Sequence, residues 1–256
     1  MTGATLEVRR IARRFQHIVA VDNISFVARA GHVTGLIGPN GSGKTTTMNL
    51  ITGLYPTDAG SILLDDTTLT GLRPHRIAAL GVARTFQNIR LLADQTVLSN
   101  VMLGTHRGHR QNLLAVLARW PGAAAEERAL QARCRELLDE VGIGHLADAA
   151  AGDLSYGDRR RVEIARALAS APRLLLLDEP AAGMNHAEKA RLGDLILQIR
   201  QSGITVLLIE HDIDLVSKVS DHVVVLNFGC EIAEGTPAEI RRDPAVIEAY
   251  LGREDA

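Results

Sequence analysis

Hydrophobic residues in this chain gather in short runs that alternate with amphipathic stretches. Apolar or β-branched runs begin at Leu6, Val33, Ile62, Val82, Leu174, Ile204 and His222. Between two of the later runs, residues 187–203 carry apolar side chains at helical spacing and end at Gly203, where a glycine is typical of a helix C-cap. Buried strands that alternate with helices predict an α/β fold with a mainly parallel central sheet.

The alternation breaks in one part of the chain. Residues 88–166 have a mostly helical pattern, clearest over residues 123–142, and we expect a helical subdomain inserted into an α/β core formed by residues 1–87 and 167–256. The strands before Val33 and those around Ser61 have the pattern of hairpins that flank this core. Within the insertion, residues 106–122 are basic at their start and then apolar at helical spacing, which predicts a helical hairpin with solvated ends.

Composition limits the class of protein. The 256 residues are 46% hydrophobic and carry a formal net charge of -2, so the chain can bury a large core and lacks the basic excess of a nonspecific nucleic-acid binder. Cys134 and Cys230 are far apart and are expected to be ordinary buried thiols. No apolar run approaches the roughly 20 residues that span a bilayer, and no secretory signal opens the chain. We therefore expect a cytosolic protein that reaches a membrane only through a partner.

The segment GPNGSGKT matches the pattern of a phosphate-binding loop, G-x-x-x-x-G-K-[ST], between an apolar strand and a helix. Its glycines let successive backbone N–H groups point inward at phosphate oxygens, and the following helix adds its positive N-terminal end. Lys44 would reach the β and γ phosphates, and the Thr45 hydroxyl would bind Mg²⁺. A chance glycine turn is the competing interpretation. The candidate nucleotide-binding residues are Gly38, Pro39, Asn40, Gly41, Ser42, Gly43, Lys44, Thr45 and Thr46.

The run LLLLDEP is a hydrophobic strand that ends in two carboxylates. Ligands of open parallel sheets bind at the carboxyl ends of the strands, so Asp178 is placed to hold Mg²⁺ and Glu179 to act as general base on the attacking water. Alone, the pair could equally be two solvated acids. Together with the phosphate-binding loop, it predicts a nucleotide hydrolase.

A second anion site is indicated at LSYGDRRR. Ser155, Tyr156 and Gly157 precede a helix with a basic first turn, where backbone N–H groups can hold a phosphate. One nucleotide is not easily held by two such sites of one chain, so we expect two chains, head to tail, that each complete the other's site. A plain helix N-cap followed by a solvated basic face is the alternative.

These motifs, in this order, together with Gln87 and His211, resemble the nucleotide-binding subunit of an ABC transporter over essentially the whole chain. The resemblance implies one ATP-binding domain over residues 1–256, with a P-loop NTPase core, an N-terminal antiparallel β subdomain and an inserted helical subdomain. It implies ATP and Mg²⁺ as ligands, Gln87 in contact with Mg²⁺ or water, and His211 on the γ phosphate. Phe15 would stack on adenine, although it could also belong to the core.

A narrower similarity concerns the segment after Gln87, residues 106–122 and the ending DPAVIEAYLG, which resemble the ATP-binding subunits of branched-chain amino-acid importers and of the related urea-type importers. This implies ATP hydrolysis that powers solute uptake through membrane permease subunits, with the chain at the inner face of the cell membrane. The working pair would be a homodimer or a heterodimer with a sister ATP-binding subunit.

Two other classes of protein are alternatives. A soluble ABC protein that acts on nucleic acid or the ribosome usually has coiled-coil insertions or two cassettes, and a P-loop kinase or GTPase leaves LSYGDRRR and His211 unexplained. Two residues depart from the family pattern: Asp158 follows LSYG where glutamine is common, and Asn185 stands where many relatives have aspartate. The first places a negative charge near the expected phosphate but also suits the positive end of the helix, so the sign of its net effect stays open. The second removes a charge that could link the two ATP sites through the loop after Glu179.

Overall fold

The computed structural model describes residues 2–87, 89–107 and 123–251, so residues 108–122 of the expected helical hairpin lie outside the described part. The chain divides into two compact units, residues 1–84 with 173–256 and residues 85–172. The sequence placed these boundaries after residues 87 and 166. The second boundary lies later because helix α6, Tyr156–Ala169, runs without interruption past Arg166.

The larger unit is built on a six-stranded sheet with the order β10-β9-β3-β8-β7-β6. Its five neighbouring strands β9, β3, β8, β7 and β6 are parallel, and β10 pairs antiparallel with β9. This confirms the predicted mainly parallel sheet. The strands are β3 Val33–Ile37, β6 Val82–Arg84, β7 Leu174–Asp178, β8 Thr205–Ile209, β9 His222–Asn227 and β10 Cys230–Gly235.

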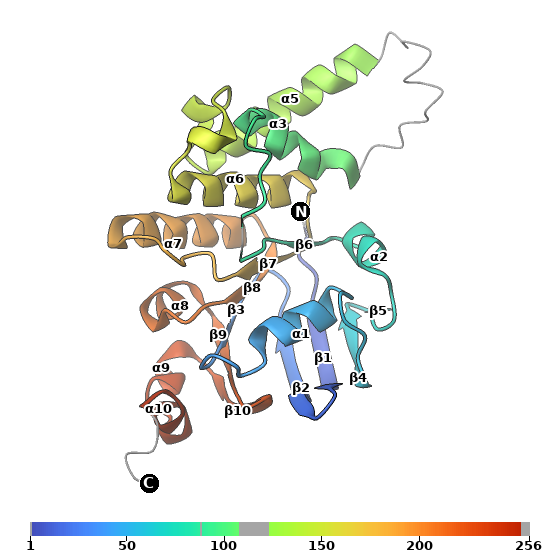
Figure 1. Ribbon diagram of the computed structural model, residues 1–256, viewed down its shortest axis with the longest axis vertical. Coiled ribbons are helices and arrows are strands. Elements are labelled where there is room, and N and C mark those ends of the chain that lie inside the picture. Colours follow the sequence, from blue (N-terminus) through green and yellow to red (C-terminus); the bar gives the residue numbers. More distant parts are fainter. Residues whose placement is uncertain (1, 88, 108–122, 252–256) are drawn as a thin grey trace. The chain divides into compact units, whose positions relative to one another are not determined.

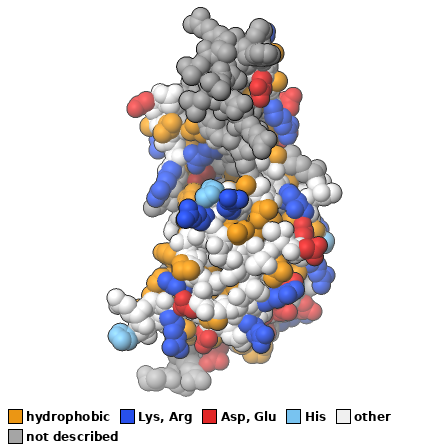
Figure 2. Space-filling view, turned by 90° about the vertical axis from the view of Figure 1, so that its right-hand side faces the viewer, with side chains coloured by type: hydrophobic (Ala, Val, Ile, Leu, Met, Phe, Trp, Pro, Cys, Tyr) orange, Lys and Arg blue, Asp and Glu red, His pale blue; other side chains and the backbone are white. Residues whose placement is uncertain are grey.

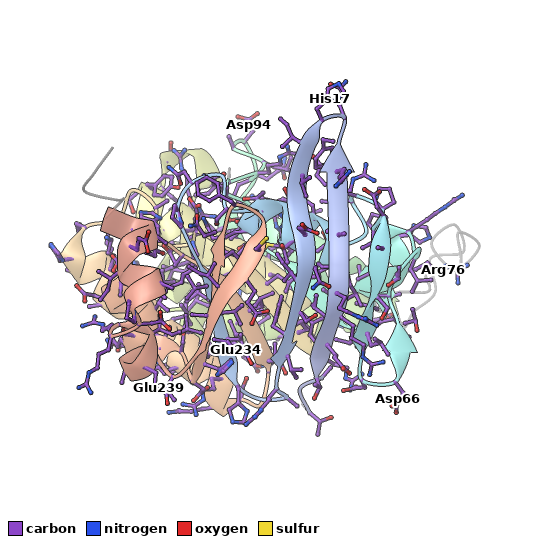
Figure 3. The ribbon with its side chains drawn as sticks, turned by 90° about the horizontal axis from the view of Figure 1, so that it is seen from below. His17, Asp66, Arg76, Asp94, Glu234 and Glu239 are labelled. Atoms are coloured by element: carbon purple, nitrogen blue, oxygen red, sulfur yellow. The ribbon has the colours of Figure 1, made fainter. Side chains whose placement is uncertain are left out.

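The same unit carries a four-stranded antiparallel sheet with the order β2-β1-β4-β5. Figure 3 shows the long β1–β2 hairpin with His17 at its tip and Asp66 at the turn between β4 and β5. The flanking hairpins expected before Val33 and around Ser61 are therefore confirmed. The strands are β1 Leu6–Phe15, β2 Ile18–Ala28, β4 Ala59–Leu64 and β5 Thr67–Thr68.

One hydrophobic core joins the two sheets. Leu174 and Leu176 of β7 pack in the same buried cluster as Met48 of helix α1 and Val8 of β1. Alternate residues of a strand point to opposite faces, so Leu175 points to the other side of the six-stranded sheet, where α7 and α8 lie (Figure 1). The helices are α1 Lys44–Ile51, α2 Pro74–Ala79, α7 His186–Gln201, α8 Ile213–Val219, α9 Pro237–Ile240 and α10 Pro244–Leu251.

The smaller unit is helical, as predicted. It contains α3 Val97–Met102, α5 Ala123–Glu140 and α6, with short 3₁₀ turns at Leu103–Arg107, Gly144–Leu146 and Ala151–Asp153. Helices α3, α5 and α6 pack on one another, and Val101, Cys134, Leu138 and Ile164 are fully buried among them. The helix expected over residues 123–142 ends at Glu140, and Gly142 follows with a positive φ of 77°.

The described surface mixes both signs of charge. On the face in Figure 2, basic and acidic side chains are interspersed with hydrophobic and uncharged ones. Cys134 is buried as expected, but the expectation for Cys230 was wrong, because Cys230 begins the edge strand β10 and is exposed. Among the helices of the described residues, none has the length and apolar character that crossing a membrane requires.

Candidate functional site

The loop after β3 has a backbone that only glycine accommodates at two positions. Gly38 has a φ of +148°, and a Cβ atom there would collide with the carbonyl oxygen of Leu226. Gly43, with a φ of +102°, is the N-cap residue of α1, and its Cβ would lie 2.6 Å from the carbonyl oxygen of Ala20. The two glycines therefore allow the phosphate-binding loop (Gly38–Thr45) to curl tightly between β3 and α1.

Lys44 lies at the centre of this curl. Its Nζ donates hydrogen bonds to the carbonyl oxygens of Gly38 at 2.7 Å and Pro39 at 2.8 Å, and it is only 6% exposed. Burial lowers the pKa of Lys44, while the charges of Glu179 and Asp178 act in the opposite direction. The structure therefore brings the loop lysine into the electrostatic range of both predicted carboxylates.

The start of α1 offers further groups to an anion. The first backbone N–H groups of a helix have no partner within the helix, and the helix dipole makes this end positive. Thr45 is exposed and Thr46 half-buried in this first turn. Lys44, the N–H groups and the Thr45 hydroxyl thus lie on one short segment.

Asp178 ends β7 and is 3% exposed. Its Oδ2 accepts a hydrogen bond from Arg84 Nη2 at 2.8 Å, and Arg84 Nη1 also donates to the side-chain oxygen of Asn49 on α1 at 2.6 Å. Arg84 therefore links the carboxylate to the helix after the phosphate-binding loop. Sequence reasoning missed Arg84, although its position at the end of a strand parallel to β7 was a usable signal.

Glu179 has an unusual backbone. Its φ is +45°, a left-handed conformation that is strained for a residue with a Cβ atom. The conformation is held by its N–H group, which donates to the carbonyl oxygen of Ile209 at 2.9 Å. The half-buried Glu179 side chain therefore departs from the direction that a continuing strand would give it.

A second buried carboxylate, Glu210, connects the loop after Glu179 to His211. Glu210 is completely buried and accepts hydrogen bonds from the N–H groups of Ala181 at 2.7 Å and His211 at 3.2 Å. Burial raises the pKa of Glu210, opposed first by the Ala181 hydrogen bond. The His211 side chain is 59% exposed, with Nδ1 3.7 Å from Glu210 Oε2. Sequence reasoning missed Glu210 because its neighbour at Ala181 is distant in sequence.

Phe15 ends β1 and is half-buried. The Arg13 guanidinium lies 4.8 Å from the centre of the Phe15 ring, and the Tyr55 ring meets it edge-on at 5.2 Å. Arg13 is itself held by Asp58 at 2.6 Å. Phe15 is therefore part of an ordered aromatic and cationic surface cluster and not of the closed core.

In the helical unit, Ser155 is the N-cap of α6. Its Oγ accepts a hydrogen bond from the N–H of Asp158 at 3.1 Å and donates one to Asp158 Oδ2 at 2.7 Å. Gly157 is buried in the first turn, and the Tyr156 side chain is 44% exposed. The unusual Asp158 thus acts as a capping partner of the serine in the LSYG motif (Leu154–Gly157).

Gln87 belongs to the same unit. Its carbonyl oxygen accepts a hydrogen bond from Arg160 Nη2 at 3.0 Å, and it lines a cavity of about 300 Å³ with Tyr156 and Arg159. Arg159 in turn donates to the carbonyl oxygens of Leu154 and Gly152. The structure therefore brings Gln87 and the LSYG motif together, which their separation in sequence did not predict.

Asn185 begins α7 through a capping box. Its side-chain oxygen accepts from the N–H of Glu188 at 3.0 Å, and Glu188 Oε2 accepts from the N–H of Asn185 at 2.9 Å. Asparagine and aspartate are equally good N-caps. The departure at this position therefore keeps the local structure and changes only the charge.

The donors in the larger unit suit Mg²⁺ in combination with a nucleotide. Among the described residues, no group of three or more His, Cys, Asp or Glu side chains is arranged to hold a metal. Thr45 and Asp178 supply oxygen atoms, and Mg²⁺ is usually held by one or two such ligands plus substrate phosphates. The residue set therefore fits a cation that arrives with its nucleotide.

Comparisons with known proteins agree with this geometry. Residues 21–182 match the ABC transporter family, and residues 231–256 match a family described as branched-chain amino acid ATP-binding cassette transporter. The branched-chain amino acid transport ATP-binding proteins BraF of Pseudomonas aeruginosa and LivG of Escherichia coli are 44% and 41% identical over 253 residues, covering 98% of this chain and 99% of each relative. The crystal structure of the ADP conformation of an ABC transporter cassette has a TM-score of 0.86 at 34% identity, covering 98% of this chain and 100% of that chain.

Proposed function

The chain belongs to the ABC transporter family and is an ATPase, and from this premise we propose that it powers the uptake of branched-chain amino acids through a partner permease. The observation that carries the proposal is the match of residues 231–256 to the branched-chain amino acid cassette family, in addition to near full-length similarity to BraF and LivG. The C-terminal match matters because it lies outside the general ATPase motifs.

The phosphate-binding loop holds the nucleotide in this proposal. When nucleotide binds, Lys44 gives up its bonds to the carbonyl oxygens of Gly38 and Pro39 and donates to the β and γ phosphates instead. The first N–H groups of α1, at the positive end of the helix dipole, also bind phosphate oxygens. Phe15 presents to adenine the ring face opposite Arg13. Adenine can stack on this free face because the Arg13 guanidinium covers the other face of the Phe15 ring.

Thr45 and Asp178 are the side chains that would hold Mg²⁺, with Gln87 as a further ligand or a water contact. The ion supplies positive charge that polarises the γ phosphate. Arg84 orients Asp178 through its bond to Oδ2.

Glu179 acts as general base on the attacking water, and His211 contacts the γ phosphate. Glu210 fixes the loop that follows Glu179 and the backbone of His211 through one carboxylate, so the two functional side chains share a support. Removal of a general base typically slows a reaction by about 10²- to 10⁴-fold.

Two such chains work as a dimer, each lending Ser155, Tyr156 and Gly157 to the nucleotide held by its partner. The second chain is an identical copy or a sister ATP-binding subunit. Docked to permease subunits, the pair lies at the inner face of the cell membrane, and closure is driven by contacts to ATP that exist only in the closed state.

Transport by vesicles tests the proposal. The chain is reconstituted with the membrane permease subunits and the solute-binding protein that co-purify with it, and uptake of radiolabelled leucine is compared with uptake of urea. We expect ATP-dependent leucine uptake that Glu179→Gln abolishes. Uptake of urea alone would assign the subunit to a urea-type importer, and ATP hydrolysis without any uptake, with ribosomes or nucleic acid co-purifying, would overturn the transport function.

A further inference from the structure

Helix α6 contains an ion pair with almost no contact with solvent. Arg160 Nη1 lies 2.7 Å from Glu163 Oε2, and the two side chains are 0% and 1% exposed. Burial of two charges is costly unless further hydrogen bonds satisfy them, and an apolar pair of similar volume is often as stable. The partners of the remaining polar atoms therefore indicate what the pair does.

Those partners are the backbone of residues 86 and 87. Arg160 donates from Nη1 to the carbonyl oxygen of Phe86 at 2.7 Å and from Nη2 to that of Gln87 at 3.0 Å. In return, the N–H of Phe86 donates to Glu163 Oε1 at 3.1 Å. Arginine and glutamate together thus hold two consecutive residues through three backbone hydrogen bonds.

The same helix begins with the LSYG motif. Ser155 is its N-cap, and the Tyr156 hydroxyl accepts a hydrogen bond from Arg160 Nη2 at 3.2 Å. One guanidinium group therefore touches both the motif proposed to meet the partner's nucleotide and the backbone of the residue proposed to sense Mg²⁺. Arginine is suited to this because its planar group presents several donors in fixed directions, whereas lysine presents a single point charge.

We propose that Arg160 and Glu163 are positioning residues that clamp the Phe86–Gln87 backbone to helix α6, so that Gln87 and the LSYG motif shift as one piece when nucleotide binds. The inference rests on the proposed roles of Gln87 and Ser155. It adds a direct mechanical connection between them, made by side chains that contact neither nucleotide nor metal.

The clamp predicts a specific effect of Arg160→Lys. Lysine keeps the charge beside Glu163 but loses the two-carbonyl contact, so hydrogen exchange at the Phe86 amide should accelerate at least tenfold while the rest of the helical unit stays protected. The kcat for ATP should fall about 10- to 100-fold with an unchanged KM, because misplacement of a distant group by about 1 Å can cost that much. Arg135→Lys is the matched control, since Arg135 forms an exposed pair with Asp148 in the same unit, and it should change neither quantity.

Nucleotide-dependent exchange tests the coupling itself. In a Glu179→Gln background, ATP should slow exchange in residues 82–90 and 154–160 together, and Arg160→Lys should leave the second response while removing the first. The double variant Arg160→Met/Glu163→Leu removes both charges together, so it leaves no unpaired buried charge. It should remain folded by circular dichroism and still show the low kcat.

Three results would overturn the clamp. They are unchanged exchange at Phe86 in Arg160→Lys, unchanged kcat in a folded variant, or equal loss of protection throughout the helical unit, which would mean a purely structural role. Failure of leucine uptake in the vesicle assay would overturn the proposed function, whereas exchange at Phe86 tests the clamp independently of that result.

Discussion

At the scale of single residues, Glu179 combines a proposed chemical role with a strained backbone. It follows the buried strand β7, and its φ of +45° turns the carboxylate out of the strand direction. We predict that Glu179→Gln binds ATP, lowers the rate of hydrolysis about 10²- to 10⁴-fold and accumulates an ATP-bound dimer. Steady-state phosphate release and gel filtration measure the two effects.

Glu136→Gln is the matched control for this change. Glu136 is an exposed residue of α5 that pairs with Arg133, so its amide should leave turnover and oligomeric state unchanged. Normal turnover of Glu179→Gln would show that another group activates the water.

Asp158 competes with the expected phosphate of the partner's nucleotide for the Ser155 hydroxyl. That hydroxyl donates to Asp158 Oδ2 at 2.7 Å, and the carboxylate places a negative charge where a phosphate is expected to approach. Asp158→Asn keeps an oxygen that can accept from the Ser155 hydroxyl but removes the charge. In the Glu179→Gln chain, we predict that it lowers the ATP concentration for half-maximal dimerisation about threefold to tenfold. The reason is that removal of one partly screened repulsion is worth about 1 kcal/mol.

Light scattering during ATP titration measures the dimer. Asp148→Asn, at an exposed residue of the same unit, should leave the midpoint in place. A higher midpoint for Asp158→Asn would show that the aspartate assists binding through its contact with Ser155.

At the scale of elements, helix α8 begins at a charged cap next to His211. Asp212 accepts from the N–H groups of Asp214 and Leu215 and pairs with Lys189 of α7 at 2.6 Å. The pKa of Asp212 lies below its ordinary value of 3.8, chiefly because the Lys189 side chain donates a hydrogen bond to its carboxylate. A lowered pKa in the folded state means that the carboxylate stabilises the fold above about pH 4, and that this contribution is lost as the pH falls through the folded-state pKa.

Asp212→Asn keeps the cap and removes the charge. We predict a free energy of unfolding about 0.5–1 kcal/mol below wild type at pH 7, and a difference that shrinks towards zero below pH 4. Urea unfolding from pH 3 to pH 7 measures it, with Asp194→Asn, in an exposed pair with Lys218, as the control. A difference that persists unchanged at pH 3 would assign the effect to the cap and not to the ion pair.

The elements also show why some features are predictable from sequence. The strand before Asp178, the glycine loop before Lys44 and the capped helix after Ser155 each depend on neighbours within a few residues, so their local structure follows from pattern and propensity. Arg84 beside Asp178, Glu210 beside Ala181 and Arg160 beside Gln87 join residues 94, 29 and 73 positions apart, respectively. Such contacts depend on strand order and helix packing, which a single sequence leaves open.

At the scale of the whole molecule, the proposed exchange of half-sites between two chains can be tested by mixing. Lys44→Met disables the phosphate-binding loop, and Ser155→Arg disables the motif lent to the partner. We predict that each variant alone is inactive, whereas an equal mixture recovers about a quarter of wild-type ATPase activity, because random pairing leaves one intact site in half of the dimers.

The mixture distinguishes the kinds of dimer. Wild type mixed with Lys44→Met/Ser155→Arg serves as the reference for random pairing. Activity of Ser155→Arg alone would place the whole site within one chain, and no recovery in the mixture would mean that the working partner is a different subunit.

The backbone of Glu179 has a consequence for attempts to stabilise the protein. A non-glycine residue in a left-handed conformation costs about 1–3 kcal/mol, so replacement by glycine or asparagine should raise the melting temperature while hydrolysis is lost. Random mutation and a screen for thermostability alone would therefore enrich inactive chains at this position. At this position the chain therefore carries a residue that its proposed hydrolysis needs and that its thermal stability does not favour.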